Sequence, residues 1–209
     1  MKKQRARTGS EKEYRKEQLK KAALHLFSKN GFKGTTVEMI TKKAQLSPAA
    51  FYLYFANKIA IYRQLNQDGI DILEKLLQDA LQAAGKSSID RLYALARAYV
   101  SFFKDYTDYF YITEILHLGN SEFFYDTRLV KELKERTLAL LKIVAFVIEE
   151  GIHKGELKKI DPLKTAVTLW GMIDGVLILE VKKSTAFTGY TVDELITQMM
   201  DAVVKGIIH

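Results

Sequence analysis

Apolar residues recur at helical spacing along most of this chain, and no segment alternates apolar and polar residues as a half-buried strand would. The first stripe, which includes Leu19 and Phe27, predicts a helix over residues 13–29. Similar stripes predict further helices over residues 59–84, 89–106, 108–118, 121–153, 162–184 and 191–208. Ser88 and Asp161 are candidate N-caps for two of them, and Thr191-x-x-Glu194 matches a capping box at the start of the last. With two short helices between residues 37 and 55, the pattern predicts an all-α fold of about nine helices.

The two short helices are separated by a tight turn. Thr35-x-x-Glu38 matches a capping box at the start of the first. The apolar pattern then breaks at residues 45–47, where Ser47 is a good N-cap and Pro48 suits the first helical position. Two helices of this size around a three-residue turn are typical of a helix-turn-helix, whose second helix can enter a DNA major groove.

The residues around this motif resemble the DNA-binding domain of the TetR family of transcriptional regulators. The resemblance covers residues 19–65, about a quarter of the chain, and depends on features in a fixed order. These features are Leu26-Phe27, Gly31-Phe32, Thr35-Thr36-Val37, Ile40, Ala44, Ser47, Tyr52, Phe55 and Lys58. Gln45 departs from the family pattern, which usually has glycine there, and Tyr54 stands where the family often has histidine. If the backbone at Gln45 needs a positive φ, the glutamine costs about 1 kcal/mol.

The resemblance implies that both helices of the motif contact DNA. It places the Thr36 hydroxyl and the nearby N–H groups against a phosphate, and Lys58 against another. The residues that open the second helix are the ones nearest base edges. The complete set of implied DNA-binding residues is Thr35, Thr36, Lys42, Gln45, Ser47, Pro48, Ala49, Ala50, Tyr52, Tyr54 and Lys58.

The second helix of the motif has few side chains that can read bases. No Arg, Asn or Gln occurs between Pro48 and Phe55, so bidentate base contacts are unavailable there. We expect specificity to come from methyl contacts, Ser47, Gln45, the basic N-terminal arm or DNA shape. Phe51 and Phe55 are expected in the core.

The net charge of +7 is unevenly distributed. Residues 1–58 hold 14 Lys/Arg and 4 Asp/Glu, whereas residues 59–209 hold 18 and 21. This contrast predicts a DNA-binding domain over residues 1–58, with a basic arm, and a larger helical ligand-binding and dimerisation domain over residues 59–209. The absence of cysteine excludes disulfides and fits a cytoplasmic protein, and the basic start lacks the apolar core of a signal peptide.

Aromatic residues crowd one part of the second domain, where ten of the 23 fall within residues 99–125. Such crowding is typical of a helix–helix core, but it also suits a pocket between helices, and both interpretations stay open. TetR-like proteins bind an inducer in this part of the chain, so the resemblance favours a pocket for a small hydrophobic or aromatic ligand. The candidate ligand-binding residues are Phe102, Phe103, Tyr106, Phe110, Thr113, His117, Phe124, Trp170 and Asp174.

Glu114-x-x-His117 has the spacing that carboxylate-bridged helical bundles use for metals. Such sites need two such pairs together with further glutamates; Glu150-x-x-His153 has the spacing of a second pair, but no pattern in the sequence marks the further glutamates. The sequence also lacks a phosphate-binding loop, a dinucleotide fingerprint and a nucleophile elbow. We therefore expect no metal, no cofactor and no enzymatic activity.

The last two predicted helices have apolar faces wider than one intramolecular neighbour needs. Gly171-x-x-x-Gly175 would let another helix approach closely. This pattern predicts a homodimer through these helices, and TetR-like proteins pair in the same way into a four-helix bundle. Residues 165–181 contain Asp174 and Glu180 and are fewer than an uncharged membrane span needs, so we expect a buried core helix with no membrane partner.

Together these features predict a homodimeric repressor that leaves a near-palindromic double-stranded operator when a small hydrophobic ligand binds. The alternative is a DNA-bound architectural or partner-binding factor with no inducer. The residues identify neither the operator nor the ligand.

Overall fold

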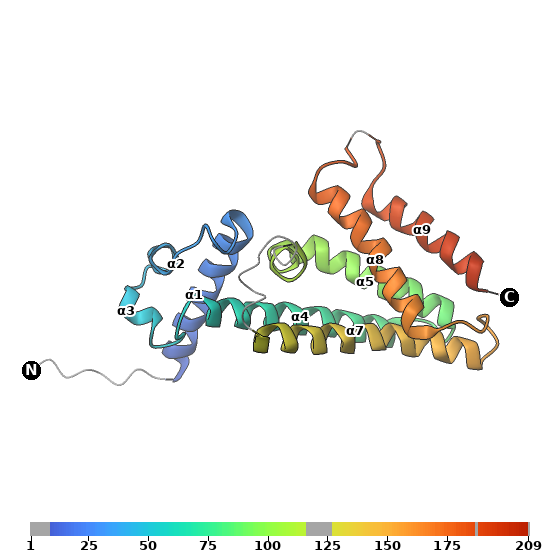
Figure 1. The fold of residues 1–209 in the computed structure, drawn as a ribbon, viewed down its shortest axis with the longest axis horizontal. Helices are drawn as coiled ribbons and strands as arrows, with labels where there is room; N and C mark the ends of the chain where they lie inside the picture. The colour runs from blue at the N-terminus through green and yellow to red at the C-terminus, as the bar shows by residue number, and fades with distance from the viewer. Residues whose placement is uncertain (1–8, 116–126, 187, 209) are drawn as a thin grey trace, which may run out of the picture. The chain divides into compact units, whose positions relative to one another are not determined.

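The computed structural model describes residues 9–115, 127–186 and 188–208, and these residues confirm the predicted all-α fold (Figure 1). They form nine α-helices and one π-helical turn, with a single isolated bridge between Leu157 and Ile208. The elements are α1 (Gly9–Asn30), α2 (Val37–Lys43), α3 (Pro48–Phe51), α4 (Lys58–Ala83), α5 (Ser88–Asp105), α6 (Thr107–Phe110), η1 (Tyr111–Ile115), α7 (Thr127–His153), α8 (Pro162–Val181) and α9 (Val192–Ile207).

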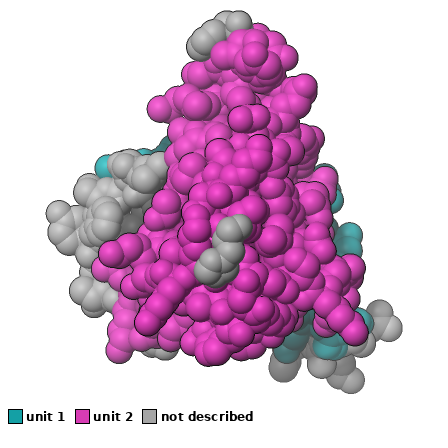
Figure 2. Space-filling model, turned by 90° about the vertical axis from the view of Figure 1, so that its right-hand side faces the viewer, with its two compact units in different colours: residues 1–69, 107–129 teal, residues 70–106, 130–209 magenta. Residues whose placement is uncertain are grey.

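The chain divides into two compact units, coloured separately in Figure 2. The head unit comprises residues 1–69 and 107–129, and the body unit comprises residues 70–106 and 130–209. Helix α4 therefore begins in the head and ends in the body, and the chain returns to the head for α6 and η1. The functional boundary at residue 58 stays a prediction.

The head unit is built on α1, which packs against α2, α6 and η1, while α2 packs against α3. Phe27, Phe32 and Tyr62 form a compact aromatic cluster, with ring centroids 5.2–5.6 Å apart. Phe51 and Phe55 are buried, as predicted. This shared core stabilises α2 and α3, which are too short to be stable alone.

The body unit is organised around α5, which packs against α8 and α9. Leu92, Leu95 and Phe102 lie on the buried face of α5. Helices α8 and α9 run alongside each other (Figure 1). Arg136 on α7 forms ion pairs with Asp71 and Glu74 on α4, which join these two long helices.

Most predicted caps are confirmed. Ser47 caps α3 through the Ala50 N–H, Asp161 caps α8, and Thr191 with Glu194 forms a complete capping box on α9. Two caps lie one residue from the predicted position. Thr36 rather than Thr35 caps α2, and Ser87 rather than Ser88 caps α5, because the Ser88 N–H is bound by the Glu156 carboxylate.

Two predicted helices are shorter or less regular than expected. The helix predicted over residues 49–55 ends at Phe51, after which bonds such as Leu53 N–H to Ala50 O tighten the chain into turns. The helix predicted over residues 108–118 is divided into α6 and the π-helical turn η1. The end of that segment and the start predicted for the long helix over residues 121–153 lie outside the described residues.

Helix α8 differs from the buried core helix that was expected. Within the described part of the chain, it is the one helix long and apolar enough to cross a membrane, with a mean hydropathy of 1.3. Only 22% of its most apolar window is buried. One face, which includes Ala166, Ile173 and Leu177, is buried, whereas the opposite face is exposed. The expectation of a buried core helix therefore holds for one face of α8 only, because α5 and α9 pack on that face and the described residues leave the other uncovered.

Candidate DNA-binding interface and ligand site

Both helices of the motif begin with a side-chain N-cap, and the residues of their first turns are mostly exposed. The Thr36 hydroxyl accepts a hydrogen bond from the Met39 N–H at 3.2 Å, and the Ser47 hydroxyl accepts one from the Ala50 N–H at 3.2 Å. Most of the predicted DNA-binding side chains are exposed. These are Thr36, Lys42, Gln45, Ser47, Pro48, Ala49 and Tyr52, while Tyr54 and Lys58 are half-buried.

The turn between α2 and α3 has the geometry that the sequence suggested it could need. Gln45 has φ of 55°, in the left-handed region that favours glycine. The Leu46 N–H donates to the Thr41 carbonyl at 2.9 Å and the Gln45 N–H to the Lys42 carbonyl at 3.2 Å. This pair of bonds is a Schellman motif, which usually has glycine at the position that Gln45 occupies.

The structure corrects two of the predicted DNA contacts. The Thr35 side chain is fully buried, and its hydroxyl donates to the carbonyls of Leu26 and Gly31. Ala50 is also buried, and its N–H is bonded to Ser47. Thr35 and Ala50 therefore hold the motif together from inside, and their side chains cannot reach DNA.

Lys58 has an internal role beside its predicted contact with a phosphate. Its ammonium group donates to the carbonyls of Phe32 and Thr35 at 2.8 and 2.9 Å. It also lies 4.1 Å from the centroid of the Phe32 ring, a cation–π distance. Lys58 thus joins the start of α4 to the segment that precedes α2, and its phosphate contact stays a prediction.

Leu53 was not among the predicted site residues, yet its side chain is 70% exposed. Tyr52 beside it is 58% exposed. Large apolar groups this exposed next to a recognition helix can contact thymine methyl groups or sugars. The apolar pattern could not reveal this, because Leu53 looks like an ordinary core residue in sequence.

The segment from Thr107 to Ile115 is held to the head by polar contacts. The Tyr62 hydroxyl donates to the Ile112 carbonyl at 2.9 Å in a buried position, and burial raises the pKa of Tyr62 far above its ordinary value. The Ser28 hydroxyl donates to Asp108 at 2.7 Å. Gly69 lies so close to this segment that an added Cβ would meet the Thr113 methyl at 2.9 Å and the Tyr109 ring at 3.2 Å.

The structure brings together only some of the predicted ligand-binding residues. In the body unit, the rings of Phe102 and Tyr106 stack with centroids 6.2 Å apart, and Phe103, the next residue of α5, is half-buried. Phe110 and Thr113 belong to the head unit. Phe110 is fully buried, and the Thr113 hydroxyl donates to the Tyr109 carbonyl. His117 and Phe124 lie outside the described residues.

Trp170 and Asp174 meet at a polar cluster between α5 and α8. The Tyr99 hydroxyl donates to Asp174 at 2.6 Å, and the Trp170 indole N–H donates to the Tyr99 oxygen at 3.3 Å. Burial raises the pKa of Asp174 to about 6, although the Tyr99 hydrogen bond opposes the shift. A carboxyl group with this pKa changes its charge near neutral pH, so the cluster can meet a ligand as acceptor or as donor.

The structure does not test the Glu114-x-x-His117 spacing, because His117 lies outside the described residues. Within those residues, no group of three or more histidine, aspartate or glutamate side chains is placed to hold a metal ion.

An all-α chain in which two short capped helices meet at a tight turn on a supporting helix is a helix-turn-helix DNA-binding protein. Residues 19–65 match the family model described as "Bacterial regulatory proteins, tetR family". Residues 19–65 therefore form a DNA-binding domain of the TetR type, as the resemblance suggested.

Known relatives support this assignment. The chain is 26% identical over 129 residues to IcaR of Staphylococcus aureus, the negative transcriptional regulator of the biofilm operon icaADBC; this match covers 62% of the chain and 67% of IcaR. It is 37% identical over 75 residues to YdgC, an uncharacterised helix-turn-helix regulator of Bacillus subtilis, covering 36% and 38%.

Solved structures match almost the whole fold. FadR from Bacillus halodurans, a fatty acid degradation regulator, superposes with a TM-score of 0.78 over 96% of this chain and 98% of FadR, at 20% identity. FadR from Bacillus subtilis, solved in complex with stearoyl-CoA, gives a TM-score of 0.75 over 92% and 99%, at 22% identity. At these identities the likeness concerns the fold.

Proposed function

We propose that this chain is a homodimeric transcriptional repressor in the cytoplasm that leaves its operator when a small hydrophobic ligand binds its body unit. The observation that carries the proposal is the helix-turn-helix, in which Ser47 opens an exposed recognition helix. The family supports DNA-binding regulation, and the name of the IcaR relative supports repression. The body unit acts as a receptor and catalyses no reaction.

The dimer forms through the exposed faces of α8 and α9. On α8, Val167, Met172 and Leu179 are 38–47% exposed. Nothing lies within 4 Å of a Cβ added at Gly171 or Gly175, so these glycines leave room for a second helix. Pairing of these faces buries the apolar surface and presents two recognition helices about 35 Å apart, one turn of DNA.

The ligand is an apolar or aromatic molecule, and an acyl chain fits the chemistry best. The body unit offers the stacked rings of Phe102 and Tyr106 and the polar cluster of Tyr99, Trp170 and Asp174. Apolar walls with a few convergent polar groups are typical of small-molecule sites. The stearoyl-CoA complex of the Bacillus subtilis FadR supports this ligand class by analogy of fold.

Repression is relieved by a shift between two states of the protein. Helix α4 belongs to both units, and η1 is bonded to α4 through Tyr62 and Ile112. A ligand that stabilises a different position of α4 or η1 changes the spacing of the two heads. It releases DNA only if it binds that state more tightly than the DNA-bound state.

Selection of bound duplexes from random-sequence DNA by the full-length protein tests this function. The expected result is enrichment of a near-palindrome, and its release by stearoyl-CoA, stearate or an aromatic compound that also quenches Trp170 fluorescence. No enriched duplex at moderate salt would contradict the DNA-binding function. An enriched duplex that no hydrophobic compound releases would contradict the proposal that a hydrophobic ligand relieves repression.

A further inference from the structure

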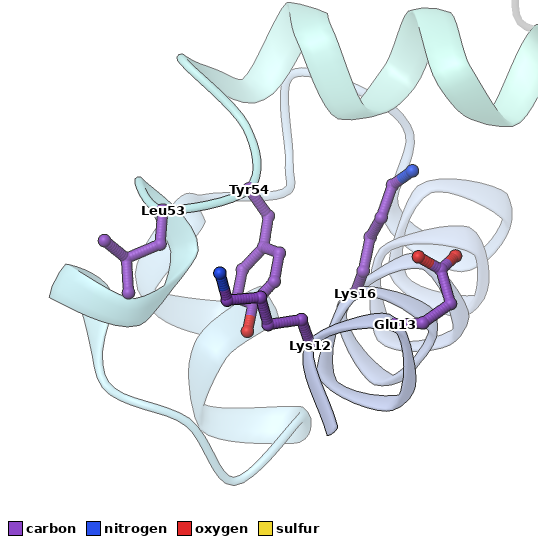
Figure 3. Close-up of a pocket in the computed structure, with 5 residues that line it drawn as sticks. All are labelled: Lys12, Glu13, Lys16, Leu53 and Tyr54. Atoms are coloured by element: carbon purple, nitrogen blue, oxygen red, sulfur yellow. The ribbon is translucent and has the colours of Figure 1, made fainter. Parts of the chain in front are cut away.

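A pocket of about 290 Å³ lies in the head unit, between the first turns of α1 and the chain that joins α3 to α4 (Figure 3). We call it the basic notch. In Figure 3, Lys12 extends from α1 across the Tyr54 ring toward Leu53, while the Glu13 carboxylate points to the other side. The residues that line the notch are Lys12, Glu13, Lys16, Leu53 and Tyr54.

The two lysines occupy the core-facing side of α1. Lys12 precedes Leu19 by seven residues and Lys16 precedes Ala23 by seven, so each pair lies on one face of the helix. Leu19 and Ala23 are completely buried. Where α1 extends past the core, this inward face therefore changes from apolar residues to lysines and points at the α3–α4 connection.

No ion pair neutralises these two lysines within the described part of the chain. Two other basic residues of α1 are paired: Arg15 with Glu11 at 2.9 Å, and Lys20 with both Glu17 and Asp68 at 2.7 Å. The lining of the notch contains a single acidic residue, so its side chains sum to one positive charge. Lys12 is exposed and Lys16 is half-buried, and two lysines without an ion pair beside a tyrosine hydroxyl favour an anion.

Tyr54 adds a hydrogen-bond donor and locates the notch beside the recognition helix. Its hydroxyl can donate to an anionic oxygen. Tyr54 lies three residues after the end of α3 and next to the exposed Leu53. When α3 enters a major groove, the groups beside it face the phosphates at the edge of that groove.

We propose that the basic notch binds a phosphodiester of the DNA backbone beside the major groove that α3 enters. Lys12 and Lys16 supply the charge, and the Tyr54 hydroxyl donates a hydrogen bond. The inference rests on the proposed function and adds a contact from α1 to it. Because a phosphate has no sequence information, the notch strengthens binding to every duplex and fixes the register of α3.

The test measures DNA affinity of the full-length protein across a salt series, with the duplex selected by wild type and a scrambled duplex. The double variant Lys12→Gln/Lys16→Gln should bind both duplexes about 10- to 100-fold more weakly at low salt. Its plot of log affinity against log salt should be less steep by about one for each phosphate that the variant no longer neutralises. Lys21→Gln is the matched control, because Lys21 is exposed on the opposite face of α1.

Two single variants separate a binding role from a folding defect. Glu13→Gln removes the acidic group from the lining and should tighten binding to both duplexes about two- to five-fold, a gain that misfolding cannot produce. Tyr54→Phe should weaken binding several-fold with little change in the salt slope, because it removes a donor and no charge.

The outcomes distinguish this inference from the proposed function. If wild type enriches no duplex, the proposed function fails. If wild type binds DNA but the double variant keeps the wild-type affinity and slope, or Glu13→Gln fails to tighten binding, the notch inference is overturned. Inorganic phosphate that binds wild type but not the double variant, with DNA affinity unchanged, would assign the notch to a free anion and also overturn it.

Discussion

The head unit and the body unit differ in where their apolar side chains lie. In the head, the aromatic cluster of Phe27, Phe32 and Tyr62 is enclosed by the unit's own helices. In the body, apolar side chains such as Val167 and Leu179 follow one face of α8 without cover. Phe146 on α7, at 56%, is the most exposed phenylalanine among the side chains that the structure describes.

This difference indicates what each unit needs from outside. The head has a closed core, and its exposed apolar groups, such as Tyr52 and Leu53, stand among basic and polar residues of the DNA-binding motif, which suits a polyanion such as DNA. The body has an exposed apolar face, which suits a second copy of the same face. Charge and apolar area thus separate the two partners that the sequence predicted, DNA and a second protomer.

The largest expected effect comes from adding a large side chain at Gly175 on the exposed face of α8. Gly175→Leu should leave the protomer folded, because a Cβ there meets nothing within 4 Å and leucine is a better helix former than glycine. Its side chain should prevent a second α8 from approaching. Operator affinity should fall at least about 100-fold, because a monomer binds only one half-site. Analytical ultracentrifugation and DNA titration measure both effects.

Gln82→Leu is the matched control for this variant. Gln82 is exposed on α4, so the substitution adds the same side chain to an exposed position of the body on a different helix. It should remain dimeric. A Gly175→Leu protein that stays dimeric and binds its operator normally would contradict the proposed interface. The exposed apolar face of α8 would then not be the surface that binds a second protomer.

The closed core of the head predicts the opposite behaviour for a glycine there. Gly69→Ala should lower the free energy of unfolding by about 1–3 kcal/mol, because the new methyl group overlaps with Thr113 and Tyr109. Thermal or urea unfolding measures this loss. Adding Thr113→Ser, which removes the methyl group at 2.9 Å, should restore much of it. An unaltered Gly69→Ala protein would show that the contact of η1 with α4 is loose.

The polar cluster of the body predicts a smaller, pH-dependent effect. The folded protein binds the Asp174 proton more tightly than the unfolded chain, because burial raises its pKa from 3.8 to about 6. Its contribution to stability is therefore fully present below about pH 4 and is lost as pH rises to about 6. Asp174→Asn should remove this loss and be more stable than wild type by about 1–2 kcal/mol at neutral pH.

Urea unfolding of both proteins from about pH 4 to 7 measures the effect as the difference between two curves. The two proteins should be equally stable at the acidic end, where Asp174 is protonated and still accepts the Tyr99 hydrogen bond. Curves that stay parallel would show that Asp174 is solvated like an ordinary surface aspartate.

Sequence patterns predicted the helices well because local signals define them. Thr191 with Glu194 and Ser47 with Pro48 mark helix starts through neighbouring residues, and both predictions are confirmed. Thr35 and Thr36 show the limit of such signals. Either could cap α2 by sequence, and only packing against Leu26 and Gly31 decides that Thr35 turns inward.

The site was predicted less completely because its contacts join distant segments. Tyr62 reaches Ile112 across 50 residues, and Tyr99 reaches Asp174 across 75. No local pattern specifies such pairs. Lys12 and Lys16 did leave a signal, since these lysines continue the core-facing spacing before the apolar stripe begins at Leu19. Charge counting alone could not separate them from the other lysines of α1.

The smallest expected effect concerns the strained turn of the head. Gln45 has φ of 55°, so Gln45→Gly should relieve the left-handed strain and stabilise the head by about 0.5–1 kcal/mol, after the entropy that glycine adds to the unfolded chain. Thermal unfolding should show a slightly higher midpoint.

The same variant removes the one amide side chain at the turn. Its affinity for a library of operator variants therefore tests whether Gln45 reads a base. Loss confined to one or two base positions would assign Gln45 a role in base reading, whereas uniform affinity would leave the glutamine as a strained turn residue only. A variant less stable than wild type would contradict the strain argument itself, because removing a Cβ at positive φ should not destabilise a turn that is exposed on its outer side.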